Sequence, residues 1–146
     1  MSFIEPRPEV YADIPCRGVV AAVMAFQAQM GQGYTGPPRE LPASLASLRM
    51  KLVREEAEEL CAAIERGELH EQLDAIVDLI YVAVGTATQA GMGDVLWAAF
   101  HRVHRSNMGK VPAPAREASK RDSVRDIVKP EGWRPADLRD LLKGGE

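Results

Sequence analysis

The sequence is poor in the features that mark disulfide-rich and membrane-spanning proteins. It has only two cysteines, Cys16 and Cys61, and neither has a Cys or His neighbour at zinc-site spacing. We interpret both as small apolar residues of a reducing compartment. The longest apolar stretch, from Ala75 to Ala87, is broken by Asp78 and is too short to span a bilayer. The first ten residues carry acids and prolines and lack a signal-peptide core, so we expect a cytoplasmic protein.

The sequence also lacks the basic excess of nucleic-acid-binding proteins. Its formal net charge is -3, which argues against broad nucleic-acid binding. A small anionic ligand remains compatible with this charge, because a bound divalent cation inverts the local field. Apolar residues make up 46% of the 146 residues and charged residues 27%, which is typical of one soluble globular domain.

Convincing strand alternation is absent, and the apolar periodicity favours helices. Glycines that follow the periodic segments, such as Gly67 and Gly91, are typical helix stops. Proline-rich stretches predict an extended lead-in, a loop and an irregular arm. We expect an all-α bundle assembled as an oligomer, a single domain over 1–146 with its core at about 19–110 and its arm at 111–146. The predicted segments are a lead-in at 1–17, helices at about 19–30, 42–66, 69–90 and 94–105, a loop at 31–43, an irregular stretch at 111–135 and a short helix at 136–142.

The second predicted helix carries acids on its apolar face. On a helical wheel Glu56 and Glu59 fall within that face and Glu55 lies at its margin. Glu58 and Glu65 point the other way, toward water. The EEAEE run is therefore not a uniformly solvated acidic surface. The apolar residues that define the face are Leu45, Leu48, Leu52, Leu60 and Ala63.

The third predicted helix carries a second set of acids. Glu71, Asp74 and Asp78 share one flank at spacings of three and four residues. Asp78 is set in a segment that is apolar almost all round. The main core face of this helix is predicted to be Leu69, Leu73, Ile76, Val77, Ile80 and Val84.

Burying an unpaired carboxylate costs about several kcal/mol or more of folding free energy. Two inward-facing acid clusters therefore require nearby positive charge to offset that cost. Carboxylate oxygens are the ligands of hard cations, which predicts a Mg²⁺ or Mn²⁺ site. The alternative is structural: the acids form a solvated face, and Asp78 caps a helix or pairs with Arg49 or Arg54.

Polar groups beyond the fourth helix suit a polyphosphate. Asn107 and Lys110 lie just past its end, where Lys neutralises charge and Asn donates a hydrogen bond. Lys129 is one of several further cations in the arm. His101 and His104 are interpreted as ordinary surface or structural histidines. On the first helix, Phe26 and Gln27 are candidates to line a base pocket.

Four segments in this order resemble one known family. They are REEAEEL (54–60), DAIVDLIYVAVGTA (74–87), HRSNMGK (104–110) and KPEGWRP (129–135). Together they resemble the MazG-like branch of the all-α nucleoside triphosphate pyrophosphohydrolases, which are related to phosphoribosyl-ATP pyrophosphohydrolases and dimeric dUTPases. The resemblance spans about residues 19–140, and some phage members are similar in length and motif.

The resemblance implies a magnesium site of the form EExxE…ExxD. Glu56 and Glu59 match the first pair of ligands, with Glu55 as a further acid, and Asp78 matches the final Asp. The sequence departs from the family at Ala75, where the pattern has Glu. Either Asp74 or Glu71 takes that role. Asn107 and Lys110 match residues expected near the phosphates.

The function implied is hydrolysis of a (deoxy)nucleoside triphosphate, dGTP/GTP or dUTP, to the monophosphate and pyrophosphate. Two or three Mg²⁺ ions, replaceable by Mn²⁺, would be held by Glu56, Glu59, Asp74 and Asp78. Glu55 or Glu71 would orient the attacking water. Lys110, with an arm cation such as Lys129, would stabilise the leaving pyrophosphate. A homodimer or homotetramer is expected, without nucleic acid or membrane, and in the host cytoplasm for a phage member.

Two other functions compete with this hypothesis. A carboxylate-bridged di-iron bundle has the right fold, but it requires Glu-x-x-His pairs and no His here follows a Glu by three residues. A non-catalytic helical oligomerisation module would also explain the helices, although it leaves the inward acids unexplained.

Overall fold

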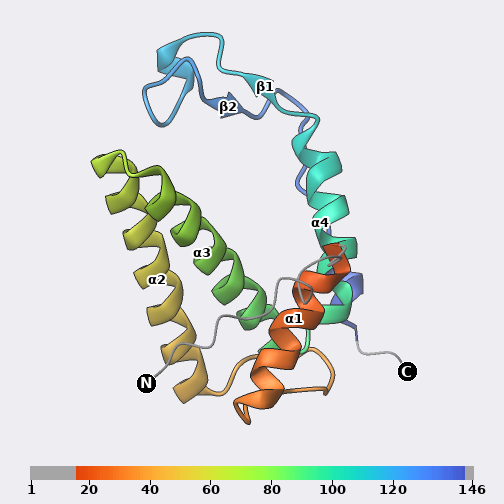
Figure 1. The fold of residues 1–146 in the computed structure, drawn as a ribbon. Coiled ribbons are helices and arrows are strands. Elements are labelled where there is room, and N and C mark those ends of the chain that lie inside the picture. Colours follow the sequence, from red (N-terminus) through yellow and green to blue (C-terminus); the bar gives the residue numbers. More distant parts are fainter. Residues whose placement is uncertain (1–15, 144–146) are drawn as a thin grey trace. The chain divides into compact units, whose positions relative to one another are not determined.

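The computed structural model describes residues 16–143, and this part of the chain contains four α-helices and one small sheet (Figure 1). The predicted mostly helical fold is confirmed. The helices are α1 (Cys16–Gln29), α2 (Ala43–Arg66), α3 (Leu69–Gln89) and α4 (Gly93–Asn107). Strands β1 (Val111–Pro112) and β2 (Ile127–Val128) and the 3₁₀ turns η2 (Arg116–Ala118) and η3 (Arg139–Leu142) complete the arm.

Glycines end α2 and α3, as the sequence predicted. Gly67 adopts φ 71° after α2, a left-handed conformation that favours glycine, and its amide donates to the Ile64 carbonyl. Gly91 adopts φ 72° after α3. The predicted extended lead-in is wrong at residues 16 and 17, because α1 begins at Cys16. The rest of the predicted lead-in, residues 1–15, lies outside the described residues.

The chain forms two compact units, which divide between Asp94 and Val95. The first contains α1, α2 and α3. The second contains nearly all of α4 and the arm. The predicted single domain over 1–146, with its core at about 19–110 and its arm at 111–146, stays a prediction. Each unit is described by itself below.

The first unit is built on an antiparallel pair, α2 and α3, joined by two residues (Figure 1). The side of α2 that faces α3 carries Arg49, Glu56 and Ala63, spaced seven residues apart. Seven residues are close to two helical turns, so these three side chains form one seam. Ala63 is buried, and its carbonyl accepts a hydrogen bond from the Gln72 side chain of α3. Two of the three seam positions are therefore charged.

Arg49 is buried but well supplied with acceptors. Its Nη2 donates to the Val82 carbonyl at 2.5 Å and its Nε donates to Thr86 Oγ1 at 3.1 Å. Gly85 makes room for it, because a Cβ there would lie 2.8 Å from Arg49 Nη2. Burial lowers the pKa of the Arg49 guanidinium. The cation thus joins the two helices through backbone and hydroxyl oxygens and not through a carboxylate.

Helix α1 packs against α3 through a buried amide. Gln27 is 4% exposed, and its Nε2 donates to the Gly85 carbonyl at 2.9 Å. Its Oε1 accepts from Thr88 Oγ1 at 2.7 Å. Val23, one turn earlier on α1, is 1% exposed and is the largest fully buried side chain among the described residues. Both ends of the Gln27 amide are engaged between the helices.

The face of α3 that was predicted to form its core is largely exposed, and this part of the prediction is wrong. Leu69 is 79% exposed, Leu73 64% and Val77 50%, and Ile76 and Ile80 are exposed as well. The reason is that α2 packs on the opposite, small-residue side of α3. We call Leu69, Leu73, Ile76, Val77 and Ile80 the apolar stripe.

The remaining core predictions divide between the two helices. On α3, Val84 is half-buried. On α2, Leu45, Leu52 and Leu60 are half-buried, whereas Leu48 is 46% exposed. Among the described residues, no single helix is long and apolar enough to cross a membrane; α3 and α4 reach that only when counted together across the bend between them.

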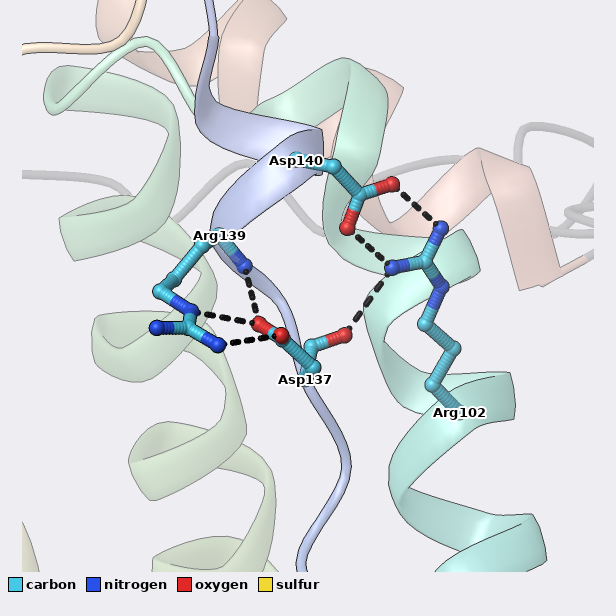
Figure 2. Close-up of polar contacts among 4 residues, drawn as sticks. All are labelled: Arg102, Asp137, Arg139 and Asp140. Atoms are coloured by element: carbon cyan, nitrogen blue, oxygen red, sulfur yellow. Dashed lines mark hydrogen bonds and ion pairs between the residues drawn. The ribbon is translucent and has the colours of Figure 1, made fainter.

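The second unit folds the arm back onto α4. Arg102 on α4 donates to both carboxylate oxygens of Asp140 and to the Asp137 carbonyl, as Figure 2 shows. Arg139 in turn donates to the Asp137 carboxylate (Figure 2) and holds the pKa of that carboxyl well below its usual range. These bidentate contacts fix η3 beside α4. The predicted helix at 136–142 is thus a short 3₁₀ turn.

The arm predicted to be irregular contains a two-stranded antiparallel sheet. Val111 pairs with Val128, and Pro112 pairs with Ile127. Each strand has only two residues, which is too short for alternation to appear in the sequence. The pairing closes the segment between the strands into a loop.

We predict that Arg49→Ala destabilises the fold by about 2 kcal/mol, because hydrogen bonds made by a buried charged group contribute about that much. The matched control is Arg54→Ala on the same helix, where the side chain is exposed. Chemical denaturation monitored by circular dichroism measures both. Equal midpoints for the two variants would contradict the role assigned to Arg49.

Candidate active site

Carboxylates from α2 and α3 meet around Glu56. This side chain sits at the centre of the helix seam, and its Oε2 is buried without a hydrogen-bond partner among the described residues. Its interacting neighbours are Asp78 and Asp74 from α3 and Glu59 and Glu55 from α2. Glu56 and Asp78 are half-buried, and the other three are exposed. The helical wheel therefore placed Glu56 on the correct side of α2.

The surroundings of Glu56 disfavour its charge. Burial raises the pKa of the Glu56 carboxyl, and repulsion from Asp78 and then from Glu59, Glu55 and Asp74 raises that pKa further. Arg49, two turns away on the same seam, directs its donors to Val82 and Thr86. The alternative in which Arg49 pairs with Asp78 is therefore not what the structure shows. The cluster lacks a compensating positive charge within the part of the chain described.

A hollow beside Glu56 is lined by Glu71 and by two acids of the cluster. Its volume is about 190 Å³, and Glu59, Glu71 and Asp74 line it. Glu71 Oε1 also lies 3.2 Å from His70 Nε2. Ala75, at the position where the family pattern has Glu, is 6% exposed and forms part of the wall. Asp74 and Glu71 both face this hollow, so both stay available as replacements for the family Glu.

The donor set fits a hard divalent cation. Carboxylates of Glu56, Glu59, Asp74 and Asp78 come from two facing helices, about one turn apart, and offer only oxygen ligands. In residues 16–143 as they stand, no three Asp, Glu, His or Cys side chains are grouped closely enough to hold one ion. Ligation therefore requires side-chain rotation, which the exposed Glu59 and Asp74 have room to make. The orphaned Glu56 oxygen is the observation that favours such a ligand.

An aromatic pair lies near the acids. Phe26 of α1 and Tyr81 of α3 meet edge to face, with ring centroids 5.5 Å apart. Tyr81 follows Asp78 by three residues and so shares its side of α3. The Phe26 ring is 44% exposed. Gln27, the other residue predicted to contact a base, is buried between helices, and its contacts support a structural role.

The residues predicted to bind phosphate, Asn107, Lys110 and Lys129, all lie in the second unit. Asn107 ends α4, and its backbone carbonyl accepts from the Lys110 amide at 3.0 Å. Lys110 and Lys129 come together beside the Trp133 ring. Asn107 is exposed and Lys110 is half-buried. Their phosphate-binding role stays a prediction.

Sequence reasoning missed two residues that shape the site. Arg49 was considered only as a partner for Asp78, although its spacing of seven residues from Glu56 marks the same seam. Tyr81 was not singled out, although it falls three residues after Asp78. The helical spacing of each was available in the sequence, but the packing of α1 against α3 was not.

A mostly helical fold with carboxylates gathered between two antiparallel helices is the class of structure that the sequence resemblance implied. The phosphoribosyl-ATP pyrophosphohydrolase family matches residues 23–107, which is more than half of the chain, and the chain belongs to that family. The resemblance to the MazG-like all-α superfamily is thereby confirmed. The chain is a nucleotide pyrophosphohydrolase, a hydrolase of phosphoric anhydride bonds. No curated protein matches its sequence.

We predict that Glu56→Gln raises the midpoint of thermal unfolding at pH 7 when divalent cations are chelated. A carboxyl whose pKa is raised by folding destabilises the protein increasingly as pH rises from its ordinary value of 4.5 through the raised value. The gain should therefore vanish below about pH 4, where Glu56 is protonated in both states. Glu58→Gln, at an exposed position, is the control. A gain in the unfolding midpoint that does not depend on pH would contradict the raised pKa of Glu56.

Proposed function

We propose that the protein hydrolyses a (deoxy)nucleoside triphosphate, dGTP/GTP or dUTP, to the monophosphate and pyrophosphate in a Mg²⁺-dependent reaction. The observation that carries this proposal is the buried Glu56 Oε2, which has no partner and is surrounded by other carboxylates. The family activity supports it and leaves the di-iron and non-catalytic alternatives without support.

Glu56, Glu59, Asp74 and Asp78 would hold the metal, as two or three ions. When bound, Mg²⁺ or Mn²⁺ supplies charge neutralisation for the phosphate chain and acidifies the attacking water. A bound cation would also offset the burial and the repulsion from neighbouring acids that raise the pKa of Glu56.

The remaining residues handle protons and charge. Glu55 or Glu71 accepts a proton from the attacking water as the water oxygen forms a bond to the α-phosphorus. The bond from that phosphorus to the bridging oxygen breaks, and pyrophosphate leaves with the electron pair. Lys110 and Lys129 neutralise the leaving group, and Asn107 donates a hydrogen bond to the phosphates.

Base recognition is assigned to the aromatic pair. The exposed face of Phe26, supported edge-on by Tyr81, offers a surface on which a base could stack close to the acids. Gln27 is left out because its amide is engaged by Gly85 and Thr88. The family description names phosphoribosyl-ATP, so this compound belongs in any substrate panel beside dGTP, GTP and dUTP.

We further propose that the protein is a homodimer, or a tetramer of two dimers, assembled through the apolar stripe of α3. The stripe exposes five large apolar side chains along one helix face, which favours burial against another surface. A second copy is the occupant that the family resemblance implies.

We predict that Glu59→Gln and Asp78→Asn each lower kcat by more than about 100-fold, because transition-state charge stabilisation by a metal contributes several kcal/mol. Pyrophosphate release from the substrate panel with Mg²⁺ measures this. The control is Glu58→Gln, which removes the same charge from the outer face of α2.

Helical content measured by circular dichroism should be unchanged in all three variants. Turnover at the wild-type rate in both Glu59→Gln and Asp78→Asn would refute the metal assignment. Turnover of phosphoribosyl-ATP alone would keep the metal assignment and replace the proposed substrate class.

We predict that Leu73→Glu converts the dimer to monomers, because a charge in the middle of the apolar stripe opposes its burial. Sedimentation equilibrium gives the mass. Ser47→Glu adds the same charge at an exposed position on α2 and should leave the mass unchanged. A monomeric wild-type protein would refute the proposed assembly.

A further inference from the structure

The sheet of the arm places two lysines side by side. Val111 pairs with Val128, so the residues that flank this pair, Lys110 and Lys129, come next to each other although they lie far apart in the sequence. Both ammonium groups lie over the Trp133 ring, at 5.3 Å for Lys110 and 4.6 Å for Lys129. The ring partly stabilises each cation, but the two like charges still repel each other.

Trp133 is fixed in place by the end of α4. Its Nε1 donates to the Ser106 carbonyl at 2.8 Å, and Ser106 Oγ donates to the Arg134 carbonyl at 2.7 Å. Gly109 lies against the ring, where a Cβ would be 3.6 Å from Trp133 Cδ1. The indole therefore sets the position of both lysines relative to α4.

These lysines open onto a cavity of about 370 Å³ within the arm. That volume lies within the roughly 300–1,000 Å³ range of small-molecule sites. The loop between the strands adds Lys120 and Arg121 to its lining. Asp126 is the one acidic residue among the lining residues.

The charge of Asp126 is already compensated. Its carboxylate accepts from Arg121 Nη1 at 2.9 and 3.0 Å, from Ser119 Oγ at 2.7 Å and from the Ile127 amide at 2.9 Å. Lys110, Lys120 and Lys129 form no ion pair with any residue in the described range 16–143. Three uncompensated ammonium groups thus line one cavity.

We propose that this arm pocket binds a polyphosphate anion, with Lys120 as a direct ligand and Trp133 as the residue that positions Lys110 and Lys129. Ammonium groups on flexible stems donate well to phosphate oxygens in several geometries. The proposal rests on the proposed function, which already assigns Lys110 and Lys129 to the leaving pyrophosphate, and it adds Lys120 and Trp133. The anion is either the triphosphate of the nucleotide or the released pyrophosphate. The pocket itself is formed entirely by the second unit.

The test is calorimetric titration of the full chain with inorganic tripolyphosphate at low salt and with divalent cations chelated. Lys120→Ala should weaken binding about 10-fold, the effect of losing one charge-assisted contact. Lys120→Arg should restore it. The matched control is Arg125→Ala, which removes one positive charge from an exposed position in the same loop and should change the affinity less than about 2-fold, since Arg125 does not line the cavity.

A fluorescence titration tests the role of Trp133. In a Trp97→Phe background Trp133 is the remaining tryptophan, and its emission should change with the same dissociation constant that calorimetry gives. Trp133→Phe keeps an aromatic ring but loses the donor to Ser106, and it should weaken binding of tripolyphosphate while the circular dichroism spectrum stays unchanged. Unaltered affinity in Trp133→Phe would remove the positioning role.

Equal weakening by Lys120→Ala and Arg125→Ala would show an effect of net charge and overturn the site, and so would an absence of binding. Binding and hydrolysis are measured separately, so the two proposals can fail independently. If the wild type binds tripolyphosphate but hydrolyses no nucleotide, only the proposed function fails. Normal binding of tripolyphosphate by Glu59→Gln would show that the arm pocket does not depend on the acidic site. Tighter binding of pyrophosphate than of nucleotide, or the reverse, supports the site and identifies the source of its anion.

Discussion

The structure depends on one electrostatic constraint, a carboxylate held in the seam between two helices. Glu56 occupies a position that packing against α3 requires to be inward, and its neighbours are further acids. Such an arrangement disfavours the charged form of Glu56, and the cation that we propose between the helices would compensate it. On this proposal, the seam couples the stability of α2 and α3 to binding of the metal. Arg49, two turns away, shows the contrast, because its charge is satisfied within the fold.

The same packing explains why α3 exposes its apolar stripe. Because the small and acidic side of α3 turns toward α2, the large apolar residues must face elsewhere. A site of this kind leaves little apolar surface to be buried between α2 and α3 themselves, which is why we propose that the stripe is buried against a second copy. The proposed catalytic site and the proposed assembly surface thus follow from the same packing of α3 against α2.

The helices and the inward position of Glu56 were predictable from the sequence, whereas the core face of α3 and the role of Gln27 were not. Glycine stops and proline breaks located the helices, and the helical wheel placed Glu56 inward. The wheel also marked Leu73 and Val77 as core, because periodicity reports that a face is apolar but not which surface covers it. The burial of Gln27 depends on how α1 docks, which no local pattern encodes.

The arm was the least predictable part. Strands of two residues give no alternation, so the pairing that joins Lys110 to Lys129 could not be foreseen. Lys120 reaches the same cavity only through the closure of the loop between the strands. The resemblance to a family pointed to Lys110 as a phosphate ligand, but family membership is shown for residues 23–107 and does not extend to the arm.

The most direct measurement is anomalous diffraction from a crystal of the wild-type protein grown with Mn²⁺. The account predicts a manganese peak between α2 and α3, within ligating distance of oxygens from Glu56 and Asp78. A structure in which Glu56 is instead paired with an arginine or lysine side chain, with no manganese between these helices, would contradict it.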